Sequence, residues 1–124
     1  MLSENQVVMV RKAIEMTYIG KCTITEYQSY KKENKSTGHK EVDIITDQPC
    51  KLSFEKVTSN FQGETAATVI QIAKVILAPE IKILPGSKMT ITQNGVTTEY
   101  SNSGEPAIYN THQEIILELF KGWS

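Results

Sequence analysis

The chain has 124 residues, the size of one domain, and its 40% hydrophobic and 22% charged residues are typical of a globular protein. A net charge of −1 gives no general attraction to DNA, RNA or an anionic membrane. The first residues lack the pattern of a secretion signal, and no apolar run approaches the ~20 residues of a membrane span. We therefore expect a single domain, residues 1–124, that folds in a cytoplasm.

The N-terminal segment has the pattern of an amphipathic helix over residues 4–17. Ser3 and Gln6 have the spacing of a capping box, and Gly20 is available to end the helix. Most apolar stripes of this kind pack on their own domain, but docking to a neighbour is an alternative, with the charged residues at the edge of the stripe. The candidate partner-binding residues are Val7, Val10, Arg11, Lys12, Ile14 and Tyr18.

Strand patterns dominate the chain from residue 21 to residue 120. In the first strand, Cys22 and Ile24 should share one face, and Thr23, Thr25 and Tyr27 the other. The charged residues 31–40 are expected to form a solvated hairpin loop. Residues 41–57 then resume the alternation, and the Gln-Pro pair at 48–49 predicts a long strand that is bent or bulged.

Residues 64–78 fit both a helix and a strand by periodicity, but their β-branched residues and the following Pro79 favour a strand. Further turns are expected at residues 85–86 and at Asn94-Gly95, the strongest turn signal in the chain. The last strand has apolar residues on both faces, with Ile116 and Phe120 opposite Leu119, so it should lie between covered surfaces. The predicted fold is mainly β, a small antiparallel barrel or sandwich of six or seven strands after an N-terminal helix.

The sequence contains no phosphate-binding glycine loop, no zinc-type cysteine spacing and no nucleophile elbow. Cys22, His39, Cys50 and His112 match no compact metal motif, and we interpret the cysteines as reduced, buried hydrophobic residues. His112 has no nucleophile and orienting partner that the sequence identifies as a catalytic trio. We therefore expect no enzyme activity, no catalytic residues, no metal and no cofactor.

A resemblance to a known family rests on three stretches, "CKLSF" at 50–54, "APEIKILPGSKMTI" at 78–91 and "HQEIILEL" at 112–119. The order of these elements, over most of residues 22–120, resembles the head-closure, or stopper, proteins of tailed bacteriophages and of phage-like particles with contractile tails. The resemblance implies a β-barrel subunit of the virion neck, assembled in a bacterial cytoplasm. It implies a ring, a hexamer or a dodecamer, below the portal and its adaptor. The ring would close the DNA-filled head and carry a tail terminator or completion protein.

In such proteins the connector between the second and third strands can enter the channel as a gate, and here it corresponds to residues 55–66. Its uncharged centre, with Phe61 among polar residues, suits a steric role beside passing DNA; a surface loop outside the channel is the alternative. The candidate gating residues are Glu55, Lys56, Val57, Thr58, Ser59, Asn60, Phe61, Gln62, Gly63 and Glu64.

Two other functions compete with this one. A small OB-like barrel that binds nucleic acid would use Tyr27, Tyr30, Tyr100 or Tyr109 for stacking, and a basic stripe would have to join Lys21, Lys31, Lys32, Lys51 and Lys56 on one face. A small metal-dependent enzyme rests only on the cysteine and histidine pairs. A connector ring would have portal, adaptor, tail proteins and copies of itself as partners, with DNA only passing through the channel and no membrane contact.

Overall fold

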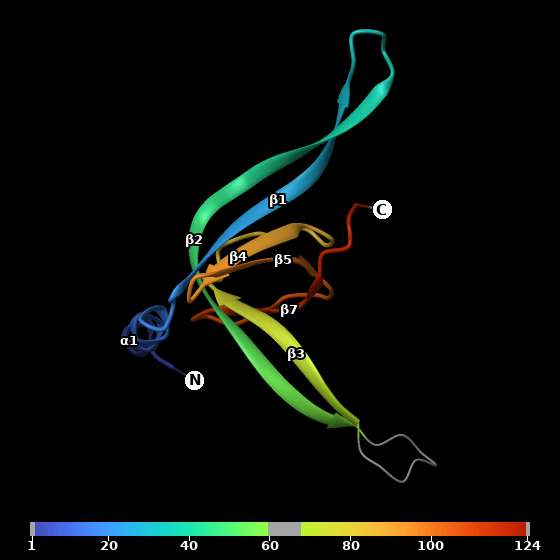
Figure 1. Ribbon diagram of the computed structural model, residues 1–124. Coiled ribbons are helices and arrows are strands. Elements are labelled where there is room, and N and C mark those ends of the chain that lie inside the picture. The colour runs from blue at the N-terminus through green and yellow to red at the C-terminus, as the bar shows by residue number, and fades with distance from the viewer. Residues whose placement is uncertain (1, 60–67, 124) are drawn as a thin grey trace.

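Across residues 2–59 and 68–123, which the computed structural model describes, the chain forms one helix followed by seven antiparallel strands. The helix α1 spans Glu4–Glu15. The strands, shown in Figure 1, are β1 (Gly20–Lys31), β2 (Thr37–Ser59), β3 (Thr68–Leu77), β4 (Lys88–Gln93), β5 (Val96–Asn102), β6 (Ala107–Ile108) and β7 (Gln113–Leu119).

The sheet closes on itself and is almost a barrel. β1 pairs with β2 on one side and β4 on the other; β4 pairs with β5, β5 with β7, β7 with β3, and β3 returns to β2. β6 pairs with β7 outside this ring. The predicted mainly β fold of six or seven strands after a helix is confirmed.

The core lies inside the ring of strands. It consists of the inward residues of the ring and Ile83 from the segment before β4. The members are Cys22, Ile24, Cys50, Leu52, Val75, Leu77, Ile83, Met89, Ile91, Tyr100, Ile115 and Leu117. Cys22 and Cys50 are both free and fully buried, as predicted.

Helix α1 begins with the predicted capping box, in which Ser3 and Gln6 exchange side-chain to backbone hydrogen bonds. It ends at Glu15, two residues before the predicted end, and the role assigned to Gly20 was wrong. Gly20 begins β1, where an added Cβ would lie 2.9 Å from Oε1 of Gln93. The Gln93 amide needs that space because it bonds the backbone N–H and carbonyl of Leu52 at 2.8 and 3.0 Å.

The prediction of a loop over residues 31–40 was too long, because β1 extends to Lys31 and β2 begins at Thr37. The predicted long, bent strand is confirmed: β2 has 23 residues, and its pairing with β1 shifts register near Asp47, whose φ is 54°. A second shift lies between Ile24 and Thr25; its extra residue is in β2, and the pairing of β1 with β4 is continuous across both residues, so β1 keeps its alternation there. Both residues are buried, although simple alternation would place Thr25 outside.

Residues 68–77 are strand, so the ambiguity between helix and strand is settled for this part of the segment. β3 has partners on both edges, and this pairing overrides the helical periodicity. The turn at Asn94-Gly95 has the two positive φ angles that were predicted, 54° and 77°. The turn at residues 85–86 is also confirmed, with Gly86 at a φ of 80°.

The prediction that β7 is covered on both faces was wrong. Ile115 and Leu117 face the core, whereas Ile116 and Leu119 are 53% and 62% exposed. A ring of strands has one interior, so alternate residues of β7 face outward, and the strand's end extends beyond the packed layer.

Two arms extend from the barrel in opposite directions (Figure 1). The β1–β2 arm comprises residues 26–45, where β1 and β2 pair only with each other. The β2–β3 arm comprises residues 54–59 and 68–72, beyond the pairing of β3 with β7. β2 runs through both arms and through the core between them. Among the described residues, no helix is long and apolar enough to cross a membrane.

Candidate interaction surfaces

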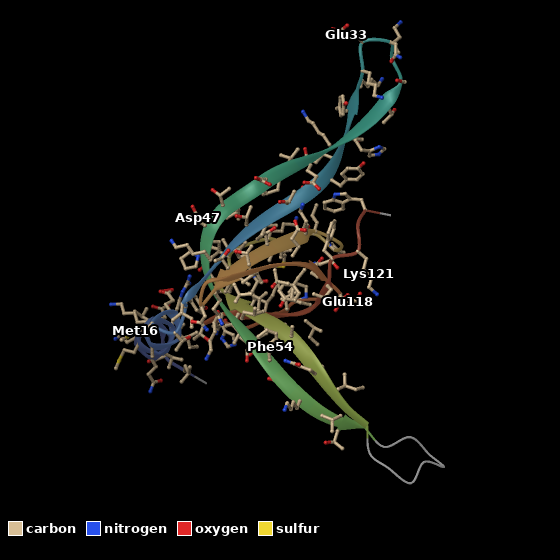
Figure 2. The ribbon with its side chains drawn as sticks, viewed as in Figure 1. Met16, Glu33, Asp47, Phe54, Glu118 and Lys121 are labelled. Carbon is tan, nitrogen blue, oxygen red and sulfur yellow. The ribbon has the colours of Figure 1, made fainter. Side chains whose placement is uncertain are left out.

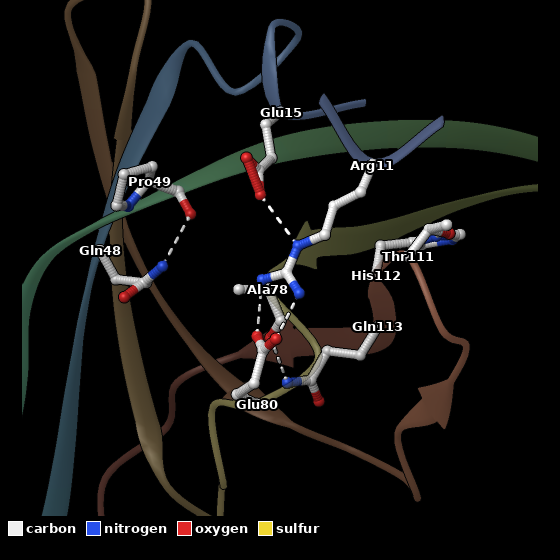
Figure 3. Close-up of polar contacts among 9 residues, drawn as sticks. All are labelled: Arg11, Glu15, Gln48, Pro49, Ala78, Glu80, Thr111, His112 and Gln113. Atoms are coloured by element: carbon white, nitrogen blue, oxygen red, sulfur yellow. Dashed lines mark hydrogen bonds and ion pairs between the residues drawn. The ribbon is translucent and has the colours of Figure 1, made fainter. Parts of the chain in front are cut away.

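Helix α1 is fastened to the barrel by a forked ion pair (Figure 3). The guanidinium of Arg11 donates from Nη1 and Nη2 to the two carboxylate oxygens of Glu80, with 2.7 Å between Nη2 and Oε2, and from Nε to Glu15 at 3.0 Å. These bonds raise the pKa of Arg11, and the bond from Arg11 lowers the pKa of Glu80. Arg11, a candidate partner-binding residue, is therefore engaged within the chain, while Lys12 is exposed.

The turn that carries Glu80 is held by Gln113 at the start of β7. This buried side chain donates from Nε2 to the carbonyls of Ala78 and Ile81, at 2.8 and 2.6 Å. Two donated bonds fix the backbone on both sides of Glu80, so the carboxylate has a defined position for Arg11.

The helix has apolar side chains on more than one side and contributes none to the core. Of its predicted stripe, Val7 and Ile14 are half-buried, as is Tyr18 beyond the helix end, whereas Val10 is exposed. Met9 and Met16 are 71% and 85% exposed, and Figure 2 shows Met16 on the helix side of the molecule. Burial raises the pKa of Tyr18.

A shallow apolar groove of about 410 Å³ separates the helix from the outer face of the barrel. It is lined by Val10, Ala13, Ile14 and Thr17 of the helix segment and by Lys51, Ile76 and His112. The helix thus rests on the barrel through an ion pair and a partly filled groove, which is a weak attachment compared with burial in a core.

His112 lies in a chain of polar contacts that sequence reasoning did not find. Its Nδ1 is 2.9 Å from the hydroxyl of Thr111, and its Nε2 is 2.9 Å from Oε2 of Glu114. Glu114 also accepts from Lys74, which bonds Glu55 on the neighbouring strand. The hydrogen bond to His112, with that to Lys74, lowers the pKa of Glu114.

Thr111, His112 and Glu114 are residue types that also occur in the catalytic trio of a hydrolase. Their arrangement here is typical of hydrogen bonds that stabilise the fold. Thr111 is buried and adjacent in sequence to its histidine, so its hydroxyl has no open approach for a substrate. Glu114 is balanced by Lys74, and the chain of contacts links β7, β3 and β2 across the outer face of the barrel.

The four residues considered for a metal site lie in three places. Cys22 and Cys50 are in the core, His39 stacks on Tyr27 in the β1–β2 arm, and His112 lies before β7. Within residues 2–59 and 68–123, no three His, Cys, Asp or Glu side chains are grouped to hold a metal ion. A hydrogen bond to the Cys50 thiol, together with burial, raises the pKa of the free Cys22 thiol.

The last described residues, 120–123, form a strap against the base of the β1–β2 arm. The Trp123 ring stacks on Tyr27 with centroids 4.9 Å apart and 6° between the planes, and Tyr27 stacks in turn on His39 at 5.2 Å. Phe120 meets Trp123 edge-on at 5.0 Å. This row of rings joins the strap to both strands of the arm.

Polar contacts reinforce the strap. Trp123 Nε1 donates to Glu41 at 2.9 Å, and Lys88 Nζ lies 3.0 Å from the same carboxylate. The bonds from Trp123 and Lys88 lower the pKa of Glu41. Burial opposes the charge of Lys88, but bonds to Glu41 and Glu99 outweigh it and raise the pKa of Lys88, whose ammonium also lies 5.2 Å from the Phe120 ring centre.

The candidate gating residues divide at residue 60. Residues 55–59 belong to β2 and pair with residues 68–72, so the prediction that the connector begins at residue 55 was wrong. The strand continues because β3 offers a partner edge as far as Thr68. The remaining candidates, Asn60, Phe61, Gln62, Gly63 and Glu64, lie outside the described residues.

The lysines proposed for nucleic-acid binding do not form one stripe. Lys31 and Lys32 are at the tip of the β1–β2 arm, and Lys56 is on the β2–β3 arm, which extends the opposite way (Figure 1). Lys51 lines the groove beside the helix. Of the tyrosines proposed for stacking, Tyr100 is buried in the core, Tyr27 already stacks with Trp123 and His39, and Tyr109 stacks on His112.

Sequence reasoning missed Glu80 and Trp123. Glu80 carried no local signal, because its partner Arg11 is 69 residues away in the chain. Trp123 did carry one: it is the single tryptophan of the chain, and a large aromatic ring near a terminus usually packs against something.

No family model matches the chain, and no curated protein matches it. Among solved structures, the chain is similar to the phage-like element PBSX protein xkdH from Bacillus subtilis. The two sequences are 14% identical, the similarity covers 81% of this chain and 90% of that one, and the TM-score is 0.45. A likeness of this size does not by itself assign a function.

Proposed function

We propose that the chain is a structural subunit of a phage-type head–tail connector, which forms a ring below the portal and its adaptor and provides the platform for the tail. The observation that carries the proposal is the course of β2, which supplies one strand to each of two arms that leave a small barrel in opposite directions. Such a shape offers contacts above and below one layer, as a spacer in a stacked assembly requires.

The distribution of apolar surface supports an assembly role. Helix α1 leaves Val8 and Met9 exposed, Met16 just after it is also exposed, and the outer face of β7 leaves Ile116 exposed. These side chains gain nothing from their own core, and contact with neighbouring subunits would bury them. The resemblance of residues 50–54, 78–91 and 112–119 to stopper proteins points to the same class.

The β2–β3 arm is the proposed gating element. Its described part bears no net charge, because Glu55 balances Lys56, and its outer residues include Val69 and Ile70, which are exposed. An arm without a strong positive charge would not hold passing DNA, so its effect in a channel would be steric.

The arrangement of the lysines does not favour the competing nucleic-acid function. A groove that follows a nucleic-acid backbone needs its positive charges on one continuous face. Here Lys31 and Lys56 lie on arms that extend in opposite directions, and Lys88 is neutralised by Glu41 and Glu99.

The proposal is tested in the bacterium that encodes the chain. A tagged copy should co-sediment with complete particles, and deletion of the gene should leave filled heads and free tails that do not join. Complementation by the unchanged chain, but not by a version without residues 26–45, is expected to restore joined particles. Normal joined particles in the deletion strain, or particles that lack the tagged chain, would contradict the connector assignment.

A further inference from the structure

The β1–β2 arm has two unpaired strand edges. β1 pairs with β4 only over residues 21–25, and β2 pairs with β3 only from Cys50 onward. Within the described residues, the outer edge of β1 at 26–31 and the outer edge of β2 at 37–49 therefore have no partner strand. Alternate N–H and C=O groups along each edge point away from the arm and can accept a further strand.

A cleft of about 710 Å³ lies beside the free edge of β1. It is lined by residues 26–29 of β1, by His39 of β2, by the turn at residues 84–87, which precedes β4, and by Trp123. The cleft continues the line that β4 occupies next to β1, so an added strand would lie beside β1 beyond Thr25, where the pairing with β4 ends because β4 begins at Lys88.

Charge along the arm favours another copy of the same chain as the partner. The arm tip, residues 31–40, has four lysines and one glutamate, whereas residues 41–49 of β2 have three carboxylates and no lysine or arginine. Asp43 and Asp47 are exposed in this acidic stretch. A basic tip laid against the acidic stretch of the next arm would pair opposite charges, whereas tip against tip would place like charges together.

We propose that copies of the chain associate head to tail through these arms, the β1 edge of one copy pairing antiparallel with the β2 edge of the next. With β1 of each copy beside β2 of the next, neighbouring strands run in opposite directions while all arms point the same way. Copies related by rotation about one axis must have their arms oriented in this way. Lys31 of one copy meets Asp43 of the next when neighbouring arms are shifted relative to each other along their length. Strands that close into a ring are shifted and tilted in this way. The inference deepens the proposed ring by naming the surfaces that meet.

The strap of residues 120–123 holds the β1–β2 arm in a fixed orientation before this contact forms. A two-stranded ribbon is marginally stable in water by itself. Stacking of Trp123 on Tyr27 and its bond to Glu41 fix the first part of the arm against the barrel, so the free edge is held in one direction before a neighbour binds.

Amide hydrogen exchange tests the proposal on the full chain. Two complete copies joined by a flexible linker have an effective concentration in the millimolar range. In a head-to-tail tandem one β1 edge and one β2 edge pair, and the other two stay free. Compared with the single chain, about half of the outward amides of β1 residues 26–31 and β2 residues 43–48 should therefore exchange about fivefold more slowly. Equal exchange in tandem and single chain would overturn the proposal. Slowing on the β1 edge alone would show pairing of two β1 edges and would overturn the head-to-tail arrangement.

Proline substitutions supply matched variants. Backbone N–H groups point to alternate sides along a strand, so Gln28→Pro and Ser29→Pro have different effects. One of them removes an N–H group on the free edge of β1, and the other removes a hydrogen bond between β1 and β2. The variant that removes only the free-edge N–H group should keep the arm folded in the single chain. In the tandem, this variant should no longer show slower amide exchange at the arm edges. Lys31→Glu combined with Lys32→Glu should also lose it, whereas Lys82→Glu, an exposed lysine in the loop before β4, should not.

The exchange experiment is independent of the particle experiment. Slowed edges in a chain that is absent from particles would reject the connector function and keep the contact between arms. If the chain is present in particles but the arm edges of the tandem exchange as fast as those of the single chain, the connector function is kept and the contact between arms is rejected. Persistence of the slowing in both the proline and the charge variants would place the contact elsewhere and overturn the inference.

Discussion

Replacing Glu80 by Gln should release helix α1 while leaving the barrel intact. The substitution keeps the shape of the side chain but removes the charge that holds the guanidinium of Arg11. Arg11 is half-buried and Glu80 largely exposed, with side-chain exposures of 30% and 61%, so we assign the forked pair about 1 kcal/mol, the upper end for surface ion pairs. A change of that size shifts the docking equilibrium about fivefold.

Amide exchange in the last turn of α1 reports this equilibrium. A 12-residue helix is marginal alone in water, so undocking should let it fray, and exchange at residues 12–15 should accelerate about fivefold in the Glu80→Gln variant. Glu15→Gln is the matched control, because it removes the charge of the other acceptor of Arg11 without touching the barrel. The control should show the smaller effect of an i,i+4 pair.

Lowering the pH should release helix α1 as the Glu80→Gln substitution does. The pKa of Glu80 is lowered by Arg11, so the stabilisation it gives is complete above its ordinary value of 4.5 and is lost as the pH falls through the lower value of the docked state. A fall in the melting temperature of the whole barrel comparable to that of a core substitution, or unchanged exchange in the helix, would refute the view that α1 is a separately attached element.

Three further results are expected. Trp123→Ala should remove about 1 kcal/mol of ring stacking and speed amide exchange in the β1–β2 arm, without changing exchange in the barrel strands; equal acceleration throughout would contradict a local strap. Gly20→Ala should lower the free energy of unfolding in a urea titration by about 1–3 kcal/mol, because its Cβ meets a fixed amide, whereas Gly104→Ala, with open space around it, should have little effect. Removing residues 57–59 and 68–70 together shortens the β2–β3 arm in register; the proposed gate predicts a folded chain and tail-deficient heads with nuclease-sensitive DNA, and fully protected DNA would rule the gate out.

Local chemistry predicted the elements that depend on neighbouring residues. The capping box at Ser3, the turn at Asn94-Gly95 and the bend near Pro49 are set within a few positions of sequence, and all three are confirmed. The mainly β fold followed from alternation and turns. Errors arose where a distant strand decides the outcome: residues 55–59 remain strand because β3 pairs with them, and Thr25 is buried where it pairs with Lys88 of β4, which is itself buried.

The candidate surfaces were predictable only in part. The apolar stripe of the helix is visible in the sequence, but its attachment is not, because Arg11 and Glu80 are far apart in the chain. The network around His112 was missed for a similar reason, since Lys74 and Glu55 come from other strands. The free edges of the β1–β2 arm depend on where β4 stops pairing, which is a property of the closed sheet and not of any local pattern.

The length of β2 has a mechanical consequence. At about 3.3 Å per residue, its 23 residues span roughly 75 Å of contour, from the turn of one arm to the end of the other. A pull on the two arm tips would run along this one strand, through its bend at Asp47 and the anchored position of Cys50. The hydrogen bonds to β1 and β3 lie across the direction of that pull, so they would bear the load together and would not open one after another. The molecule therefore has a load-bearing axis that is a single covalent strand.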